Sequence, residues 1–182
     1  FLGENPEKAS KYIGNAAGSM YNTPYSFANE TDVFKLPESN IEIKKDTVID
    51  NLRHTTITIT PQRDVNQIRL YTDRNVDFRH LEYNGVVFKP DSTEIFYRKR
   101  GSKGMLSYYI GVGDSLKFSY VVPNGTQPKF TLKEFSFDLL NNPNFKVSAR
   151  PNTSMPQPSI PNDAVIVEST IDMSILKKTG IK

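Results

Sequence analysis

The stretch that decides the fold covers residues 104–122, with the sequence GMLSYYIGVGDSLKFSYVV. Two runs rich in aromatic and β-branched residues, 105–110 and 115–122, flank the turn-forming group 111–114, which contains two glycines and an aspartate. Runs of this composition favour β-strands, and a short Gly- and Asp-containing group between two such runs is typical of a hairpin turn. The stretch therefore predicts a central hairpin of two antiparallel strands.

The second run of this hairpin alternates between apolar and polar residues. Leu116, Phe118 and Tyr120 fall on one face of an extended strand, and Lys117 and Ser119 fall on the other. One face is thus predicted to point into a core. Because an isolated hairpin is only marginally stable in water, this strand needs further strands and a second layer to cover its apolar face.

Similar short runs, separated by turn residues, continue along the chain from residue 38. They lie at residues 41–43, 56–60, 68–70, 81–88, 94–97, 129–137, 145–149 and 164–167. The run at 81–88 contains Asn84-Gly85, a pair that accepts the positive φ angles of a type I′ hairpin turn. About ten strands at roughly ten-residue spacing, with no heptad or βαβ rhythm, predict an all-β fold, an antiparallel β-sandwich.

The N-terminal residues 1–37 do not show the strand pattern of the rest of the chain. Asn5 is a good helix N-cap, Pro6 suits the first helical position and Gly14 can end a helix, so residues 5–13 predict a short helix. Residues 15–37 show no periodicity and contain scattered aromatic residues, which indicates an extended arm whose aromatic side chains pack on the sheets.

The domain organisation follows from these elements. We expect an N-terminal helix and aromatic arm at 1–37 that packs on the domain, a β-sandwich domain at 38–173, and a C-terminal tail at 174–182. The segment 150–161 is rich in proline, so we expect an extended strap that crosses the surface before the last strand.

Composition narrows the functional classes. The 182 residues include no cysteine, which excludes disulfides, thiolate metal sites and cysteine nucleophiles. The net charge of +3 is spread along the chain, which gives no support to nucleic-acid binding. The longest apolar runs are far shorter than the ~20 residues that cross a bilayer, so no membrane span is predicted. The first residues do not resemble a signal peptide, and we interpret Phe1 as a cut within a longer chain.

Two features indicate a possible interaction surface. A basic cluster at Arg98, Lys99 and Arg100 precedes the central hairpin, and either a solvated loop tip or a contact with an anionic surface explains it. Tyr108 and Tyr109 could stack on sugars, although adjacent residues of a strand face opposite ways, so at most one of them belongs to a given platform.

Catalytic and metal-binding patterns are absent from the sequence. Its two histidines, His54 and His80, have no close metal-ligand spacing, and each is adjacent to a predicted strand, where a partly exposed histidine is the simpler interpretation. Asp46 and Asp50 could be acids or calcium ligands, but scattered surface charge explains them more simply. There is no GxSxG elbow and no dinucleotide-binding glycine pattern. We therefore predict no catalytic residue, cofactor site or metal ligand in this chain.

The order of several small motifs resembles the C-terminal region of membrane-bound M28-family zinc peptidases of the bacterial type. After an aromatic arm, the residues that carry this resemblance are Asp46-Thr47, Arg53 with Thr55 and Ile57, Asn84-Gly85, Leu116-x-Phe118-x-Tyr120, Ala149-Arg150-Pro151, Met155-Pro156 and Asn162-Asp163. The opening Phe1-Leu2-Gly3 is similar to the segment that follows the membrane helices in bacterial members. The likeness covers most of the chain, through turn and strand residues rather than catalytic ones.

The resemblance implies a non-catalytic accessory domain whose parent polypeptide carries the chemistry elsewhere. In that family a two-zinc aminopeptidase domain uses His, Asp and Glu ligands, and none of those motifs matches a position in this chain. Zinc is therefore expected in the peptidase domain of the parent. The implied partner is that peptidase domain, on which this chain would dock or to which it would restrict access. The implied location is the periplasmic, extracytoplasmic side of a bacterial membrane, with attachment through upstream helices.

A second class of function remains open. A stand-alone β-sandwich module that binds carbohydrate or a surface protein would have the same fold, because a β-sandwich by itself does not select a function. The absence of tryptophan weakens the carbohydrate interpretation.

Overall fold

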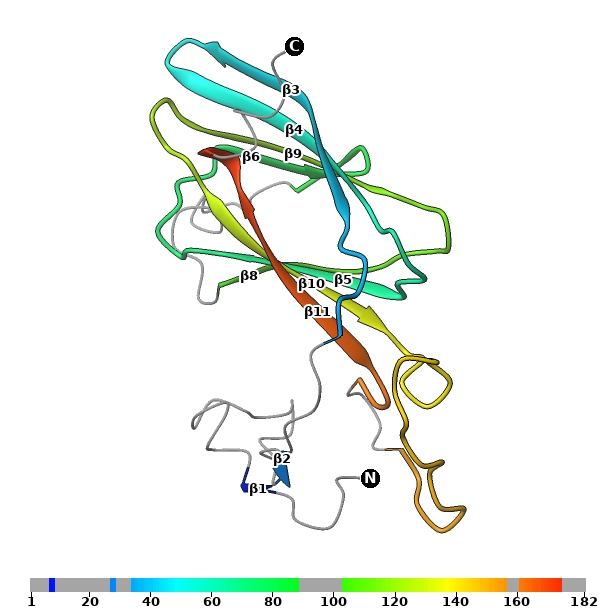
Figure 1. Ribbon diagram of the computed structural model, residues 1–182. Helices are drawn as coiled ribbons and strands as arrows, with labels where there is room; N and C mark the ends of the chain where they lie inside the picture. The colour runs from blue at the N-terminus through cyan, green and yellow to red at the C-terminus, as the bar shows by residue number, and fades with distance from the viewer. Residues whose placement is uncertain (1–6, 9–26, 29–33, 89–102, 157–160, 175–182) are drawn as a thin grey trace. The chain divides into compact units, whose positions relative to one another are not determined.

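The computed structural model describes residues 7–8, 27–28, 34–88, 103–156 and 161–174 (Figure 1). Contacts divide the chain into two compact units. The smaller combines Phe1–Leu36 with Phe137–Val165, and the larger combines Pro37–Ser136 with Ile166–Lys182. The segment 137–165, which the sequence assigned to the sandwich domain, thus groups with the N-terminal arm.

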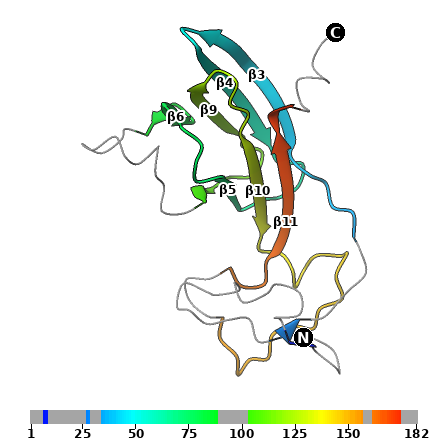
Figure 2. The same cartoon turned by 90° about the vertical axis from the view of Figure 1, so that its left-hand side faces the viewer.

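The larger unit contains two antiparallel sheets, which confirms the predicted all-β sandwich (Figures 1 and 2). The first sheet has five strands in the order β3 (Asn40–Ile49), β4 (Leu52–Thr60), β9 (Leu116–Pro123), β6 (His80–Tyr83) and β7 (Val86–Val87). The second has four strands in the order β11 (Val165–Asp172), β10 (Lys129–Ser136), β5 (Gln67–Thr72) and β8 (Gly104–Tyr109).

The core lies on the inner faces of these two sheets. Leu116 and Phe118 on β9 are completely buried and Tyr120 is 1% exposed, as the alternation of the sequence predicts, whereas Lys117 between them is exposed. Phe118 stacks on Tyr83 of β6, with ring centroids 5.0 Å apart. Its edge-to-face contact with Phe130 of β10, at a centroid distance of 5.4 Å, is part of an aromatic cluster that joins the two layers. The buried residues of the core include Ile57, Ile59, Ile68, Leu70, Phe78, Phe130, Leu132 and Ile171.

The predicted central hairpin is wrong. The two predicted runs form strands over 105–109 and 116–122, but β8 pairs with β5 in one sheet and β9 pairs with β4 and β6 in the other. The turn between them does form, with the Asp114 N–H donating to the Gly111 carbonyl and Gly113 at a φ of 82°. Beside it Ile110 enters the core. A turn fixes a reversal of the chain but not the sheet that each flanking strand joins, and here the chain crosses from one layer to the other.

The Asn-Gly turn is confirmed. Asn84 and Gly85 have φ angles of 47° and 82°, and Tyr83 pairs with Val86 across the hairpin of β6 and β7. Asp50 and Asn51 make a second tight turn of this kind, with φ angles of 49° and 59°, between β3 and β4. Asn and Asp tolerate the left-handed region better than other non-glycine residues, because their short polar side chains bond locally.

A bulge in β3 decides which of its side chains face the core. Ile43 is opposite Ile57, but the next residue in register is Lys45, opposite Thr56, so Lys44 is the inserted residue. The insertion reverses the alternation of the strand. Asp46 consequently lies on the inner face, beside Thr55.

In the smaller unit, Glu7–Lys8 (β1) pair with Phe27–Ala28 (β2) as antiparallel strands. The predicted helix over 5–13 is therefore wrong at Glu7 and Lys8, and its other residues lie outside the described residues. A helix of this length is marginal by itself, and pairing with an extended segment satisfies the same backbone groups.

The remaining strand predictions have mixed outcomes. The strand predicted at 145–149 is wrong, because these residues have no ladder partner, and instead Phe145 contacts Phe34 edge to face at 5.0 Å. The strand predicted at 164–167 is confirmed as the start of β11. The strand predicted at 94–97 and the tail beyond Ser174 lie outside the described residues. The proline-rich segment contains a turn in which Ser154 N–H donates to the Pro151 carbonyl.

Candidate functional site

The two tyrosines of the predicted interaction surface point to opposite sides of β8. Tyr108 packs against the core, and its hydroxyl accepts a hydrogen bond of 3.0 Å from the Asn84 side-chain amide. Tyr109 is 71% exposed and lies opposite Gln67 of β5. Of these two tyrosines, Tyr109 is therefore the one available on the outer face of the four-stranded sheet. The basic cluster of Arg98, Lys99 and Arg100 lies outside the described residues.

The two histidines lie in one row on the outer face of the five-stranded sheet. His54 on β4 and His80 on β6 are both in register with Val121 on β9, which separates them. Two strand spacings place their backbones about 9.5 Å apart. His80 Nε2 is 3.6 Å from a carboxylate oxygen of Glu82. Within the described ranges, no group of three or more His, Cys, Asp or Glu residues converges as a metal site.

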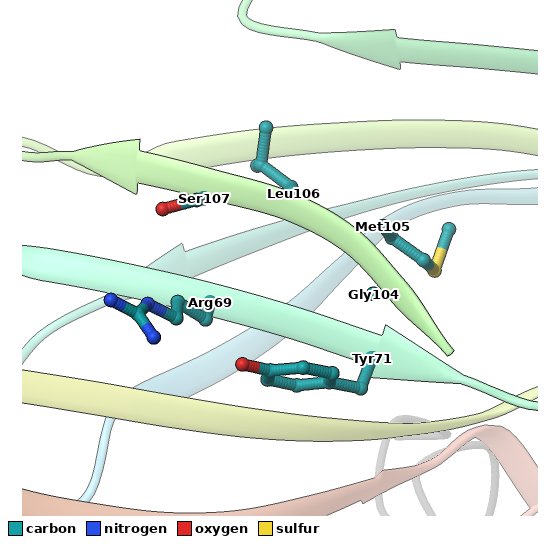
Figure 3. A pocket seen from close by; sticks show the side chains of 6 residues that line it. All are labelled: Arg69, Tyr71, Gly104, Met105, Leu106 and Ser107. Atoms are coloured by element: carbon teal, nitrogen blue, oxygen red, sulfur yellow. The ribbon is translucent and has the colours of Figure 1, made fainter. Parts of the chain in front are cut away.

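An open depression lies over β5 and β8 (Figure 3). Its volume is about 360 Å³, and its lining consists of Arg69, Tyr71, Gly104, Met105, Leu106 and Ser107. At its floor the pairing of β5 with β8 shifts between Leu70 and Tyr71. The shift places Gly104 opposite Tyr71, where the missing side chain leaves room above the sheet.

The only charged side chain in this lining, Arg69, is held in place from two directions. Its guanidinium carbon lies 4.5 Å from the centre of the Phe135 ring, and Phe135 is itself buried on β10. Its Nε donates to Gln67 Oε1 at 3.2 Å, and Gln67 Nε2 donates to Ser107 Oγ at 2.9 Å. Arginine has only donors, so the Gln67 atom facing it must be the oxygen, which fixes the orientation of the amide.

A second polar cluster is buried on the inner face of the five-stranded sheet. Arg53 donates to both carboxylate oxygens of Asp46, with Nε to Oδ1 at 2.7 Å and Nη2 to Oδ2 at 3.2 Å. Thr55 Oγ1 donates to Asp46 Oδ1 at 3.4 Å, and Tyr120 is the cross-strand neighbour of Thr55. Burial raises the pKa of the Tyr120 hydroxyl, although the Thr55 hydroxyl and the charge of Arg53 act in the opposite direction. This cluster binds three strands together.

Asp46 therefore differs from the scattered surface charge that the sequence suggests. Its carboxylate is engaged by Arg53, and Asp50 lies exposed in the turn at the end of β3. The two carboxylates do not form a joint acid pair.

Glu134 on β10 is a buried carboxylate whose contacts anchor the entry to β3. It is completely buried, and it accepts hydrogen bonds from the Ser39 hydroxyl at 2.9 Å and the Ser39 N–H at 3.3 Å. Arg63 donates to the Glu134 carbonyl at 3.0 Å and to the Ser136 hydroxyl. These contacts fix the chain as it enters the sandwich.

Comparisons with known proteins add no relative: no protein-family model, no curated protein and no solved structure matches the chain. Among the described residues, no helix is both long and apolar enough to cross a bilayer.

Sequence reasoning did not find the cluster at Arg69. Its members come from three strands, β5, β8 and β10, and Arg69 and Phe135 are far apart in the sequence. The one available signal is Phe135, which breaks the alternation of Phe130 and Leu132 and so lies on the outer face.

Proposed function

We propose that this chain is a non-catalytic accessory domain of a membrane-bound M28-like zinc aminopeptidase. It would dock on the peptidase domain of its own polypeptide, or restrict access to it, on the extracytoplasmic side of the membrane. The observation that carries the proposal is the convergence of the motif residues by which the chain resembles this family.

Three of those motifs meet in the buried cluster of the five-stranded sheet. Asp46 comes from the Asp-Thr motif, Arg53 and Thr55 come from the Arg-containing strand, and Tyr120 ends the Leu-x-Phe-x-Tyr strand. They lie on β3, β4 and β9, which are neighbours in the sheet. Motif residues that are separate in the sequence but pack into one cluster support a scaffold shared with that family. The same residues scattered over a surface would support it less.

Two further motifs meet in the smaller unit. Arg150, from Ala-Arg-Pro, forms an ion pair with Asp163, from Asn-Asp, and Arg150 Nη2 lies 2.6 Å from each carboxylate oxygen. The Asp163 carbonyl also accepts from the Leu139 N–H. These motif residues thus have structural roles, which is what a non-catalytic domain requires of them.

The chemistry belongs to another part of the parent in this proposal. A two-zinc hydrolase needs several ligands around ions about 3.5–4 Å apart, together with a general base. The two histidines of this chain are separated by a whole strand, β9. We assign the zinc ions and the catalytic residues to the peptidase domain.

The test compares an M28-type peptidase domain with and without this chain joined to it in the parental order. We expect the joined form to differ in thermal stability, or in the ratio of kcat/KM for short and long peptide substrates, because a docked domain adds contacts and limits access. The chain alone should bind no stoichiometric zinc and should release nothing from aminoacyl reporter substrates. Identical stability and substrate range in the two forms would contradict the docking role.

The alternative, a module that binds a carbohydrate or a surface protein, gains support from the outer face of the four-stranded sheet. The exposed Tyr109 and the depression beside Arg69 offer a ring, a cation and apolar atoms on one side of one sheet. A glycan array distinguishes the two functions, because a carbohydrate module retains a glycan without any peptidase domain.

A further inference from the structure

We propose that the depression over β5 and β8 is a binding site for a peptide carboxylate, in which Arg69 receives an acidic side chain of an extended peptide. This inference does not depend on the identity of the parent protein. It is derived from the donors that converge on the depression, from how they are held, and from the shape of the depression.

The guanidinium of Arg69 is oriented before any ligand arrives. The contact of its Cζ with the Phe135 ring holds the guanidinium over that ring, and the hydrogen bond from Nε to Gln67 restricts its rotation. Gln67 is only 3% exposed and is anchored in turn by Ser107, so the support is itself rigid. An ion pair that does not have to order a free side chain loses less conformational entropy on binding.

The binding end of Arg69 remains available. Its Nη1 and Nη2 groups have no hydrogen-bond or ion-pair partner among the described residues. These two nitrogens form the fork that matches the two oxygens of a carboxylate. Because Nε is already bonded to Gln67 while Nη1 and Nη2 are free, a planar anion would bind end-on, at Nη1 and Nη2.

The other polar groups of the depression can also donate. Ser107 Oγ already accepts from Gln67, which leaves its own hydrogen for a ligand. Figure 3 shows the Tyr71 hydroxyl turned toward Arg69 along β5. The lining contains one positive charge and no carboxylate. The nearby Lys133, whose Nζ is 5.8 Å from the centre of the Tyr71 ring, forms an ion pair with Glu168 at 2.8 Å.

The openness of the depression selects the kind of ligand. A small free carboxylate would stay largely in water here, and a solvent-exposed ion pair contributes little by itself. The ring of Tyr71 and the side chain of Met105 offer apolar contact area beside the charge, whereas Leu106 is in register with Leu70 and packs against the core. Arg69, Tyr71 and Ser107 all face outward from β5 and β8. An extended peptide that lies on this outer face would direct alternate side chains toward the sheet and place one acidic side chain over Arg69.

The experiment uses the full chain and the labelled heptapeptide Ser-Val-Ser-Glu-Ser-Val-Ser, with binding measured by fluorescence anisotropy at physiological ionic strength. We expect Arg69→Met to weaken binding by about tenfold or more, since a charge-assisted pair is lost. The same peptide with Gln in place of Glu should bind the unchanged protein as weakly as the Glu peptide binds the Arg69→Met variant. Arg74→Met is the matched control, because Arg74 is exposed in the loop after β5. The affinity of this variant for the Glu peptide should differ from that of the unchanged protein by less than about twofold.

Two further measurements keep the result independent of protein stability. Ser107→Ala should cause a smaller loss of affinity while leaving Arg69 stacked on Phe135. In the unchanged protein, titration with the Glu peptide should shift the NMR signals of the Gln67 side-chain amide and the Arg69 Nε–H. The proposal is overturned if the Glu and Gln peptides bind equally, if neither binds, or if Arg74→Met weakens binding as much as Arg69→Met. Preference for a phosphoserine peptide or an oligouronate over the Glu peptide would also overturn it.

Discussion

Replacing Asp46 and Arg53, separately and together, tests whether the buried cluster stabilises the sandwich as one unit. The side chain of Arg53 is 4% exposed and that of Asp46 is 16% exposed. Asp46→Ala leaves a guanidinium buried without its anion, and we expect it to cost about 3–5 kcal/mol of unfolding free energy. Arg53→Met leaves a carboxylate that water can still reach, so the expected cost is lower, about 2–3 kcal/mol.

The double variant separates the pairwise interaction from the two single losses. Once both charges are absent, neither is left buried alone, so the double variant should be more stable than the sum of the single effects predicts, by at least about 1.5 kcal/mol. Urea unfolding followed by circular dichroism measures all four proteins, with equal m-values as the condition for comparing them. Glu42→Ala is the control, because the ion pair of Glu42 with Lys44 is exposed and should contribute no more than about 1 kcal/mol. A coupling energy below about 0.5 kcal/mol, or equal costs for the exposed and buried pairs, would refute the reasoning.

Two further predictions concern the core and the C-terminal strand. Phe118→Ala should cost about 3–5 kcal/mol in urea unfolding because it leaves a cavity among stacked rings, whereas Lys117→Ala should change stability by less than about 0.5 kcal/mol. Equal losses would show that the register of β9 is wrong. Hydrogen bonds from Ser174 and Lys129 lower the pKa of Asp172 from its ordinary value of 3.8 to about 2. The stability that these bonds contribute is present above about pH 3.8 and lost as the pH falls toward 2, so Ser174→Ala should raise the carboxyl midpoint seen by NMR.

Part of this fold follows from local sequence. Alternation along β9 places Leu116, Phe118 and Tyr120 on one face, because side chains of an extended strand point to opposite sides in turn. Asn84-Gly85 predicts its hairpin equally well, since few residue pairs accept two successive positive φ angles. These features depend on neighbouring residues alone, and the structure confirms them.

The pairing of strands follows from tertiary structure instead. The turn at 111–114 and the strands on either side are visible in the sequence, but the sequence predicted that they pair with each other. In the structure they join different sheets, because β9 gains neighbours on both sides and Ile110 enters the core between the layers. Backbone hydrogen bonds are the same whichever strand is the neighbour, so side-chain packing across the whole domain selects the neighbouring strand.

The polar clusters at Asp46 and at Arg69 also depend on tertiary structure rather than on local sequence. One inserted residue, Lys44, reverses the alternation of β3 and turns Asp46 toward Arg53. A strict alternation without this insertion would place Asp46 on the outer face. Arg69 gains its orientation from Phe135, a residue 66 positions along the chain that lies beside it only because β10 pairs with β5. The sequence by itself determined the strands of the two large sheets and the inward face of β9. Tertiary structure decided which side chains meet, because the contacts that orient Asp46 and Arg69 are made across strands whose register no local pattern records.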